Sequence, residues 1–280
     1  MFGEGMQLVV VYYLGDTLHE DLNSSELQVA WVDTAILFGL GLGCFLGGTC
    51  SDMFGRKPTL QIANLLSAIF GVASAFVQNC WALLACRLLL GISLGAFIPA
   101  SVSLVLETTP KAYRDTAAVA LPVALGACGK IVVAGLADLL HEGSGQSIIH
   151  WRLLLFLCTV PDILGLVLEI LSVTIPSLHT IESPYWLLVH SQGAEASAQV
   201  RHLAEQNGKG DEFPEGTAIA IPEKEVKQDH EHHYLALAKS AWARPAVIGA
   251  IAQSFLAFAY FGLLYCLPFH MERWVHDAAM

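Results

Sequence analysis

Long apolar runs separated by short polar turns are the feature that most constrains this chain. Five runs of about 20 residues or more precede a long polar stretch, and one follows it. A helix that rises about 1.5 Å per residue needs about 20 residues to cross roughly 30 Å of hydrocarbon. Only 14% of the 280 residues are charged, whereas a soluble domain carries roughly 25%. The sequence therefore predicts an all-α integral membrane protein whose first partner is the lipid bilayer.

The apolar runs divide the chain into three predicted parts. A helix bundle spans residues 1–182, a polar central loop spans 183–244, and a seventh membrane helix with an outer tail spans 245–280. The first run is short and lacks the basic start and small-residue cleavage site of a signal peptide, so we interpret it as a truncated membrane helix. The six helices predicted within the bundle cover about 1–15, 30–50, 59–79, 82–106, 116–139 and 151–176.

Lys and Arg in the short connections predict the orientation in the membrane. Basic residues lie in the predicted loops 53–58 and 107–115, whereas the turn at 16–26 contains acids and no Lys or Arg. We therefore expect these two loops and the central loop 183–244 to be cytoplasmic. The membrane is either the plasma membrane or that of an internal vesicle. The net charge of −11 gives no reason to expect a nucleic-acid partner.

Glycines four residues apart predict where helices touch. Gly39, Gly43 and Gly47 share one face of the second predicted helix, and Gly91 and Gly95 share one face of the fourth. In lipid, helices associate through close packing, so small residues mark contact faces. Plain packing is the favoured interpretation. The alternative is that smooth glycine faces let the helices rock against each other during a conformational cycle.

Charged residues inside the predicted helices indicate a candidate cavity. Arg87 lies early in the fourth helix and Lys130 deep in the fifth. A central charge costs about 2.5 to 3.5 kcal/mol on insertion scales and therefore faces a cavity or a partner. Glu4 and Gln7 share one face of the first helix. These four residues are our candidates for the solute and coupling cavity, in which Lys130 and Glu4 either form a structural ion pair or bind a charged solute. Four other acids are interpreted as lying nearer helix ends, namely Asp33, Asp138, Asp162 and Glu169.

Two polar motifs have less specific interpretations. Asn23-Ser24-Ser25 is a glycosylation sequon, but we favour a helix N-cap with Glu26 three residues on. The "HEHH" stretch at 230–233 favours a solvated patch over a metal site, because no further ligands lie at useful spacing. The sequence contains no nucleotide-binding loop and no nucleophile–base arrangement. We therefore expect no enzyme activity, catalytic residue, cofactor or metal.

Three motifs resemble those of the major facilitator superfamily. The residues Gly48-x-x-x-Asp52-x-x-Gly55-Arg56-Lys57 resemble its signature loop between the second and third helices. The stretch "RLLLGISLGAFIPASVSLVLETTPKAYR" at 87–114 resembles its fourth helix, which ends in E-x-x-P-x-x-x-R. The stretch "IESPYWLL" at 181–188 resembles the E-S-P-R-W-L sequence of sugar porters and organic-ion transporters.

Within this group the chain is most similar to the synaptic vesicle glycoprotein branch. The similarity lies in residues 51–57, 4–14 and 257–264. Members have twelve helices in two halves, each built from inverted three-helix repeats, with the substrate between the halves near mid-membrane. The resemblance therefore implies a fragment that contains the N-terminal six-helix bundle and helix seven.

The resemblance also implies a function and a gate. The function is secondary active transport of a small organic solute, an organic ion or a sugar-like molecule, by alternating access with a proton or another solute as the coupling partner. The cytoplasmic gate comprises Gly48, Asp52, Gly55, Arg56, Lys57, Glu107, Pro110, Arg114 and Glu182, with Gly48 and Gly55 as turn residues. The chain departs from the family pattern at Met53 and Tyr185, where bases are usual.

Two alternatives to transport remain. The first is a truncated remnant without transport activity, or a partner of a full-length transporter. The second is a seven-helix receptor. A loop of about 60 residues, a half-length first segment and the loop motif all argue against the receptor.

Overall fold

The computed structural model describes residues 1–140, 150–174 and 181–209, together with seven positions between 244 and 255. Contacts divide the chain into two units, Met1–Ala220 and Ile221–Met280. In the second unit the described residues are helical. The "HEHH" stretch and most of the predicted seventh helix lie outside the described residues, and the predicted boundaries at 182 and 244 stay predictions.

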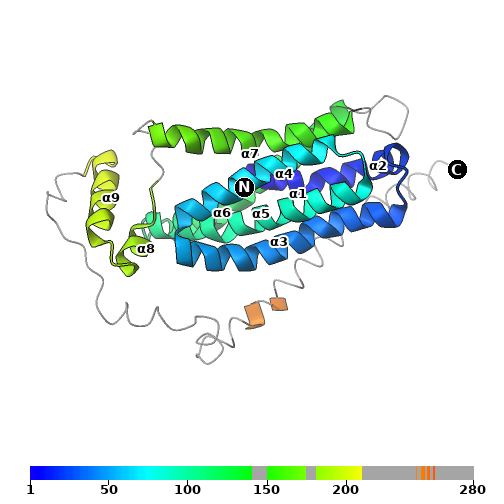
Figure 1. Cartoon of the computed structure of the whole chain (residues 1–280). Helices are drawn as coiled ribbons and strands as arrows, with labels where there is room; N and C mark the ends of the chain where they lie inside the picture. Colours follow the sequence, from blue (N-terminus) through cyan, green and yellow to red (C-terminus); the bar gives the residue numbers. More distant parts are fainter. Residues whose placement is uncertain are drawn as a thin grey trace. The chain divides into compact units, whose positions relative to one another are not determined.

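All elements in the described part of the chain are helices (Figure 1). Five of them are long and apolar enough to cross a membrane. The N-terminal elements are α1 (Phe2–Val9), the 3₁₀ helix η1 (Val10–Leu14) and α2 (Gly15–Asp21). The long helices are α3 (Glu26–Phe54), α4 (Arg56–Phe76), α5 (Cys80–Thr108), α6 (Arg114–Leu139) and α7 (Trp151–Thr174). Two shorter helices follow, α8 (Pro184–Val189) and α9 (Gly193–Gln206).

The long helices lie where the apolar runs predict them, and the differences are at their ends. Helix α3 begins four residues early because Ser25 forms a capping box with Gln28. The N-cap prediction is thus confirmed, but the cap is Ser25 rather than Asn23, and its partner is not Glu26. The loop predicted at 53–58 is wrong in length, since Gly55 alone separates α3 from α4.

The prediction of a single helix over 1–15 is wrong. Helix α1 changes to the 3₁₀ geometry of η1 at Val10, and α2 starts at Gly15. The consecutive valines at 9–11 are β-branched and lower helix propensity. In Figure 1, α1 begins about halfway along the length of the long helices.

Glycines allow two pairs of helices to approach closely. A Cβ atom on Gly43 would overlap the carbonyl oxygen of Ile92, and one on Gly91 would overlap that of Ile36, across the α3–α5 interface. A Cβ on Gly5 would overlap the backbone of Gly126 across the α1–α6 interface. The predicted packing role of the α3 and α5 glycines is confirmed, whereas their role in rocking stays a prediction.

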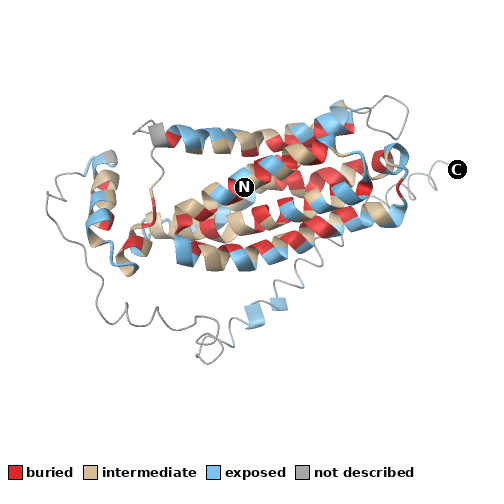
Figure 2. Ribbon diagram, in the orientation of Figure 1, coloured by how far each residue is buried: buried red, intermediate tan, exposed pale blue. Residues whose placement is uncertain are grey.

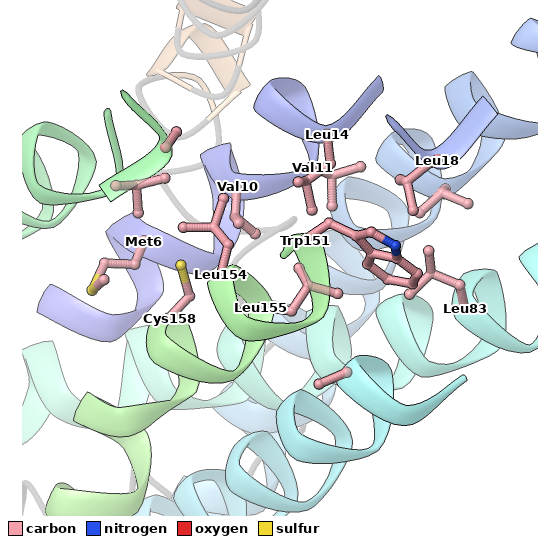
Figure 3. Close-up of a cluster of buried hydrophobic side chains, with 14 of the residues drawn as sticks. Met6, Val10, Val11, Leu14, Leu18, Leu83, Trp151, Leu154, Leu155 and Cys158 are labelled. Carbon is pink, nitrogen blue, oxygen red and sulfur yellow. The ribbon is translucent and has the colours of Figure 1, made fainter. Parts of the chain in front are cut away.

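A hydrophobic cluster holds the N-terminal elements against α7 (Figure 3). It includes Val10 and Leu14 of η1, Trp151 and Leu155 of α7, and Leu83 of α5. The indole N–H of Trp151 donates a 2.6 Å hydrogen bond to Asp21. The outward surfaces of the long helices are exposed (Figure 2) and carry many large apolar side chains, which suits contact with lipid tails.

We expect Gly43→Ala to destabilise the bundle by about 1 to 3 kcal/mol, because the added methyl group overpacks the α3–α5 interface. The measurement is the midpoint of thermal unfolding in detergent, followed by circular dichroism. Gly41→Ala is the matched control, since Gly41 lies in the same helix with nothing within 4 Å of an added Cβ. Equal midpoints for the two variants would contradict the prediction.

Candidate functional site

A cavity of about 210 Å³ lies between α1, α4, α5 and α7. Its lining includes Ser67, the twelfth of the 21 residues of α4, and Asp162, the twelfth of the 24 residues of α7. Since these helices are long enough to span a bilayer, the cavity lies near mid-membrane. The full lining comprises Met1, Phe2, Gly3, Glu4, Ala63, Asn64, Ser67, Ser93, Leu94, Phe97, Pro161, Asp162, Gly165 and Glu169.

Asp162 is the residue that the sequence interpretation placed wrongly. It lies in the middle of α7 rather than near a helix end, and it is only 8% exposed. The Ser67 hydroxyl donates a 2.8 Å hydrogen bond to its Oδ2 atom. A helix cap or a snorkelling side chain would reach water, so neither explanation fits Asp162.

Two further polar residues line the cavity: Asn64, which sequence reasoning missed, and Glu169, which it placed nearer a helix end without a role in the cavity. The Oε2 atom of Glu169 is buried and has no hydrogen-bond partner within the described part of the chain. The spacing of the polar residues along α4 and α7 could have indicated that they face the same cavity. Asn64 and Ser67 are three residues apart, and Asp162 and Glu169 are seven apart, so each pair shares one helix face.

The predicted cavity residues divide into two groups. Arg87 is completely buried, and its Nη1 donates a 3.0 Å hydrogen bond to Oε1 of Gln7. Gln7 in turn donates a 3.1 Å bond to the Thr159 hydroxyl. Glu4 lines the cavity and interacts electrostatically with Lys130 of α6, which lies outside the lining. A hydrogen bond thus connects Gln7 with Arg87, whereas Lys130 acts on Glu4 through its charge.

A second polar cluster lies where α3, α4 and α5 end near Gly55. Arg56 lies 3.1 Å from Asp52 and 3.1 Å from Glu107, and its guanidinium also donates a 2.8 Å hydrogen bond to the Ser51 carbonyl. The Arg56 side chain is 11% exposed. One arginine therefore connects the ends of three helices through two carboxylates and a carbonyl.

Glu182 acts on the backbone rather than on a basic side chain. Its carboxylate accepts hydrogen bonds from the backbone N–H groups of Arg56 at 2.9 Å, Lys57 at 3.1 Å and Ser183 at 2.9 Å. The first two N–H groups begin α4, where free donors and the positive helix end favour an anion. Gly55 allows this approach, because its φ is +106° and a Cβ would lie 2.5 Å from Glu182.

The remaining gate residues are less connected. The prediction that Gly48 is a turn residue is wrong, because Gly48 lies inside α3 with open space around it. Pro110 lies in the turn after α5, where its carbonyl accepts from the N–H of Tyr113. Arg114 donates to the Thr109 carbonyl at 3.5 Å and forms no ion pair with any described residue.

Comparison with known proteins gives one family match. Residues 6–269 match the family described as "Sugar (and other) transporter". The 4-hydroxybenzoate transporter PcaK of Pseudomonas aeruginosa is 28% identical over 71% of this chain and 42% of its own length. Organic cation/carnitine transporter 7 of Arabidopsis thaliana is 28% identical over 81% of this chain and 42% of its own length. Human synaptic vesicle glycoprotein 2A is 24% identical over 82% of this chain and 31% of its own length.

The solved structures show a similar fold. The major facilitator superfamily proton:xylose symporter XylE, bound to a bromodeoxyglucose, matches with a TM-score of 0.63 and 21% identity. The match covers 89% of this chain and 53% of the symporter. The chain thus spans about half the length of the relatives that it matches, or less.

We expect Glu182→Gln to destabilise the protein by about 1.5 to 3 kcal/mol, because it removes the charge from hydrogen bonds to three backbone N–H groups. Thermal unfolding in detergent provides the measurement. Glu195→Gln is the control, since Glu195 is exposed on neighbouring α9 and exposed substitutions usually change stability by less than about 0.5 kcal/mol. A similar effect of both changes would show that Glu182 does not act as a cap.

Proposed function

We propose that this chain, which belongs to the sugar (and other) transporter family, forms the N-terminal helix bundle of a secondary active transporter for a small organic solute. The observation that carries the proposal is the polar cavity at the middle of long apolar helices. Polar and charged groups at that depth are costly in lipid and mark solute or ion pathways. Two of the named relatives are transporters, PcaK and organic cation/carnitine transporter 7, so we propose no enzyme chemistry.

The proposed mechanism is alternating access. The bundle 1–182 supplies one wall of the solute site, the segment 183–244 links it to the following helices, and 245–280 contains the seventh. Glu4 and Asp162 contact the solute from the cavity lining, while Gln7 and Arg87 hold α1 against α5. Lys130 acts on Glu4 and is assigned a role in coupling to a proton or another solute.

The Arg56 cluster is proposed as part of the cytoplasmic gate. Its two ion pairs connect α3, α4 and α5. The Arg56–Asp52 pair, whose carboxylate is 58% exposed, contributes up to about 1 kcal/mol, and a conformational balance of a few kcal/mol can be shifted by several such interactions. In the proposed orientation, 53–58, 107–115 and 183–244 face the cytoplasm of a plasma or vesicle membrane.

The proposal is tested by solute uptake into proteoliposomes. The purified chain, alone and coexpressed with the last five helices of a full-length relative, is reconstituted and offered a panel of labelled organic anions, cations and sugars. Saturable uptake that responds to a proton gradient supports the transporter. No uptake in either preparation, together with stable binding of the chain to an intact relative, supports the alternative of a non-transporting partner.

We expect Lys130→Ala to reduce gradient-driven uptake at least tenfold, because it removes the basic side chain that acts on Glu4. Exchange of labelled solute without a gradient should fall less, since Lys130 lies outside the cavity lining. Lys130→Arg, which keeps the charge, is the control. Unchanged uptake by Lys130→Ala would eliminate the coupling role.

A further inference from the structure

We propose that the cavity binds a small organic cation and that Asp162 supplies the anion that contacts it. This inference deepens the proposed function by naming the class of solute and the residue that selects it. It rests on the charges in the cavity lining, on the burial of Asp162 and on the apolar side chains beside it.

The lining is acidic. It contains three carboxylates, from Glu4, Asp162 and Glu169, whereas none of its members is Lys, Arg or His. The α-amino group of Met1 lies in the lining and Lys130 acts on Glu4 from outside it. The acids outnumber these two positive groups, so the net charge of the site favours a cation over an anion.

Asp162 lacks a basic side-chain partner among the described residues. None of the ion pairs in that part of the chain includes Asp162 or Glu169. The buried arginine does not compensate, because Arg87 bonds to Gln7 and is absent from the lining. The positive group that acts on Asp162 is the α-amino group of Met1, which also acts on Glu4. Since buried carboxylates are strongly disfavoured without counter-charges and one such group cannot balance the three carboxylates of the lining, a bound cation would supply a missing charge.

The hydrogen bond from Ser67 fixes the Asp162 carboxylate. It occupies Oδ2 at 2.8 Å and leaves Oδ1 next to Gly3, where an added Cβ would overlap it. Glu169, two turns further along α7, adds a buried oxygen without a hydrogen-bond partner. The two carboxylates therefore line the same wall of the cavity.

The remaining lining suits the methyl groups of a quaternary ammonium. Phe2, Leu94, Phe97 and Pro161 contribute apolar surface. Aromatic faces also attract cations, and a quaternary ammonium lacks hydrogen-bond donors, so it loses less hydration on leaving water than a primary ammonium does. A volume of about 210 Å³ restricts the ligand to a small molecule.

The test is a binding comparison between matched probes. The full chain, with its affinity tag at the C-terminus so that Met1 is unchanged, is placed in lipid nanodiscs at pH 7.5. Equilibrium dialysis measures labelled choline, its neutral isostere 3,3-dimethylbutan-1-ol, and benzoate as an anion. We expect choline to bind at least tenfold more tightly than the neutral isostere, and benzoate to bind more weakly than either.

Variants of Asp162 test whether this residue contacts the cation. Asp162→Asn keeps the shape of the side chain and an acceptor for Ser67, and it should reduce choline affinity at least tenfold while leaving the neutral isostere unaffected. Asp138→Asn removes a charge from the exposed end of α6 and should change neither. Binding of the neutral isostere shows that a variant is folded. If Asp162→Asn does not fold, Asp162→Glu replaces it, and we expect it to retain the preference for choline.

Several outcomes would overturn the inference. They are equal affinities for choline and its isostere, tighter binding of benzoate, no choline binding at millimolar concentration, or full choline binding by Asp162→Asn. Equal affinities would show that the carboxylates are neutralised by protons. Transport of some other solute without choline binding would refute the cation site alone, whereas choline binding without any uptake would refute only the transport proposal.

Discussion

The close approach of helix backbones at glycines is the constraint on which this structure depends. Helices α3 and α5 meet at Gly43 and Gly91, and α1 and α6 meet at Gly5 and Gly126. The membrane segments can be paired as α1 with α5, α3 with α6, and α4 with α7. Exchanging the members of each pair turns the α3–α5 interface into the α1–α6 interface. The same exchange maps the α4–α5 contact onto the α7–α1 contact and the α4–α7 contact onto itself. The pattern is that of inverted three-helix repeats.

The glycine contacts explain how so short a first helix brings polar groups to the centre. With Gly5 against Gly126 and Gly3 against Asp162, α1 lies close enough for Gln7 to bond both Arg87 and Thr159. A larger residue at either glycine would move Gln7 away from the guanidinium. Arg87 would then be fully buried without this partner, which costs far more than the lost contact itself.

Patterns that repeat along one helix could be predicted from the sequence, whereas properties set by neighbouring helices could not. The α3 and α5 glycine stripes and the apolar runs are local, and they lie where expected. The depth of Asp162 depends on where α7 begins and on Ser67 of α4, which no local pattern encodes. Glu182 lies beside Arg56 and Lys57, but its charge alone does not show that its partners are their backbone N–H groups. Likewise, Gly48 and Gly55 belong to the same motif, but their backbone conformations differ, since of the two only Gly55 has a positive φ.

The two polar clusters are connected through α4 and α7. Helix α4 carries Ser67, which bonds Asp162 of α7, and its first N–H groups bond Glu182, which follows α7 in the chain. The 11 residues from Arg56 to Ser67 span about 16 Å of helix. Sliding α4 along α7 would break the hydrogen bond between Ser67 and Asp162, so these helices should move as one rigid unit. In the proposed cycle the bundle therefore rotates as a whole, and the ion pairs of Arg56, which reach to α3 and α5, stabilise that unit from the end at which α4 begins.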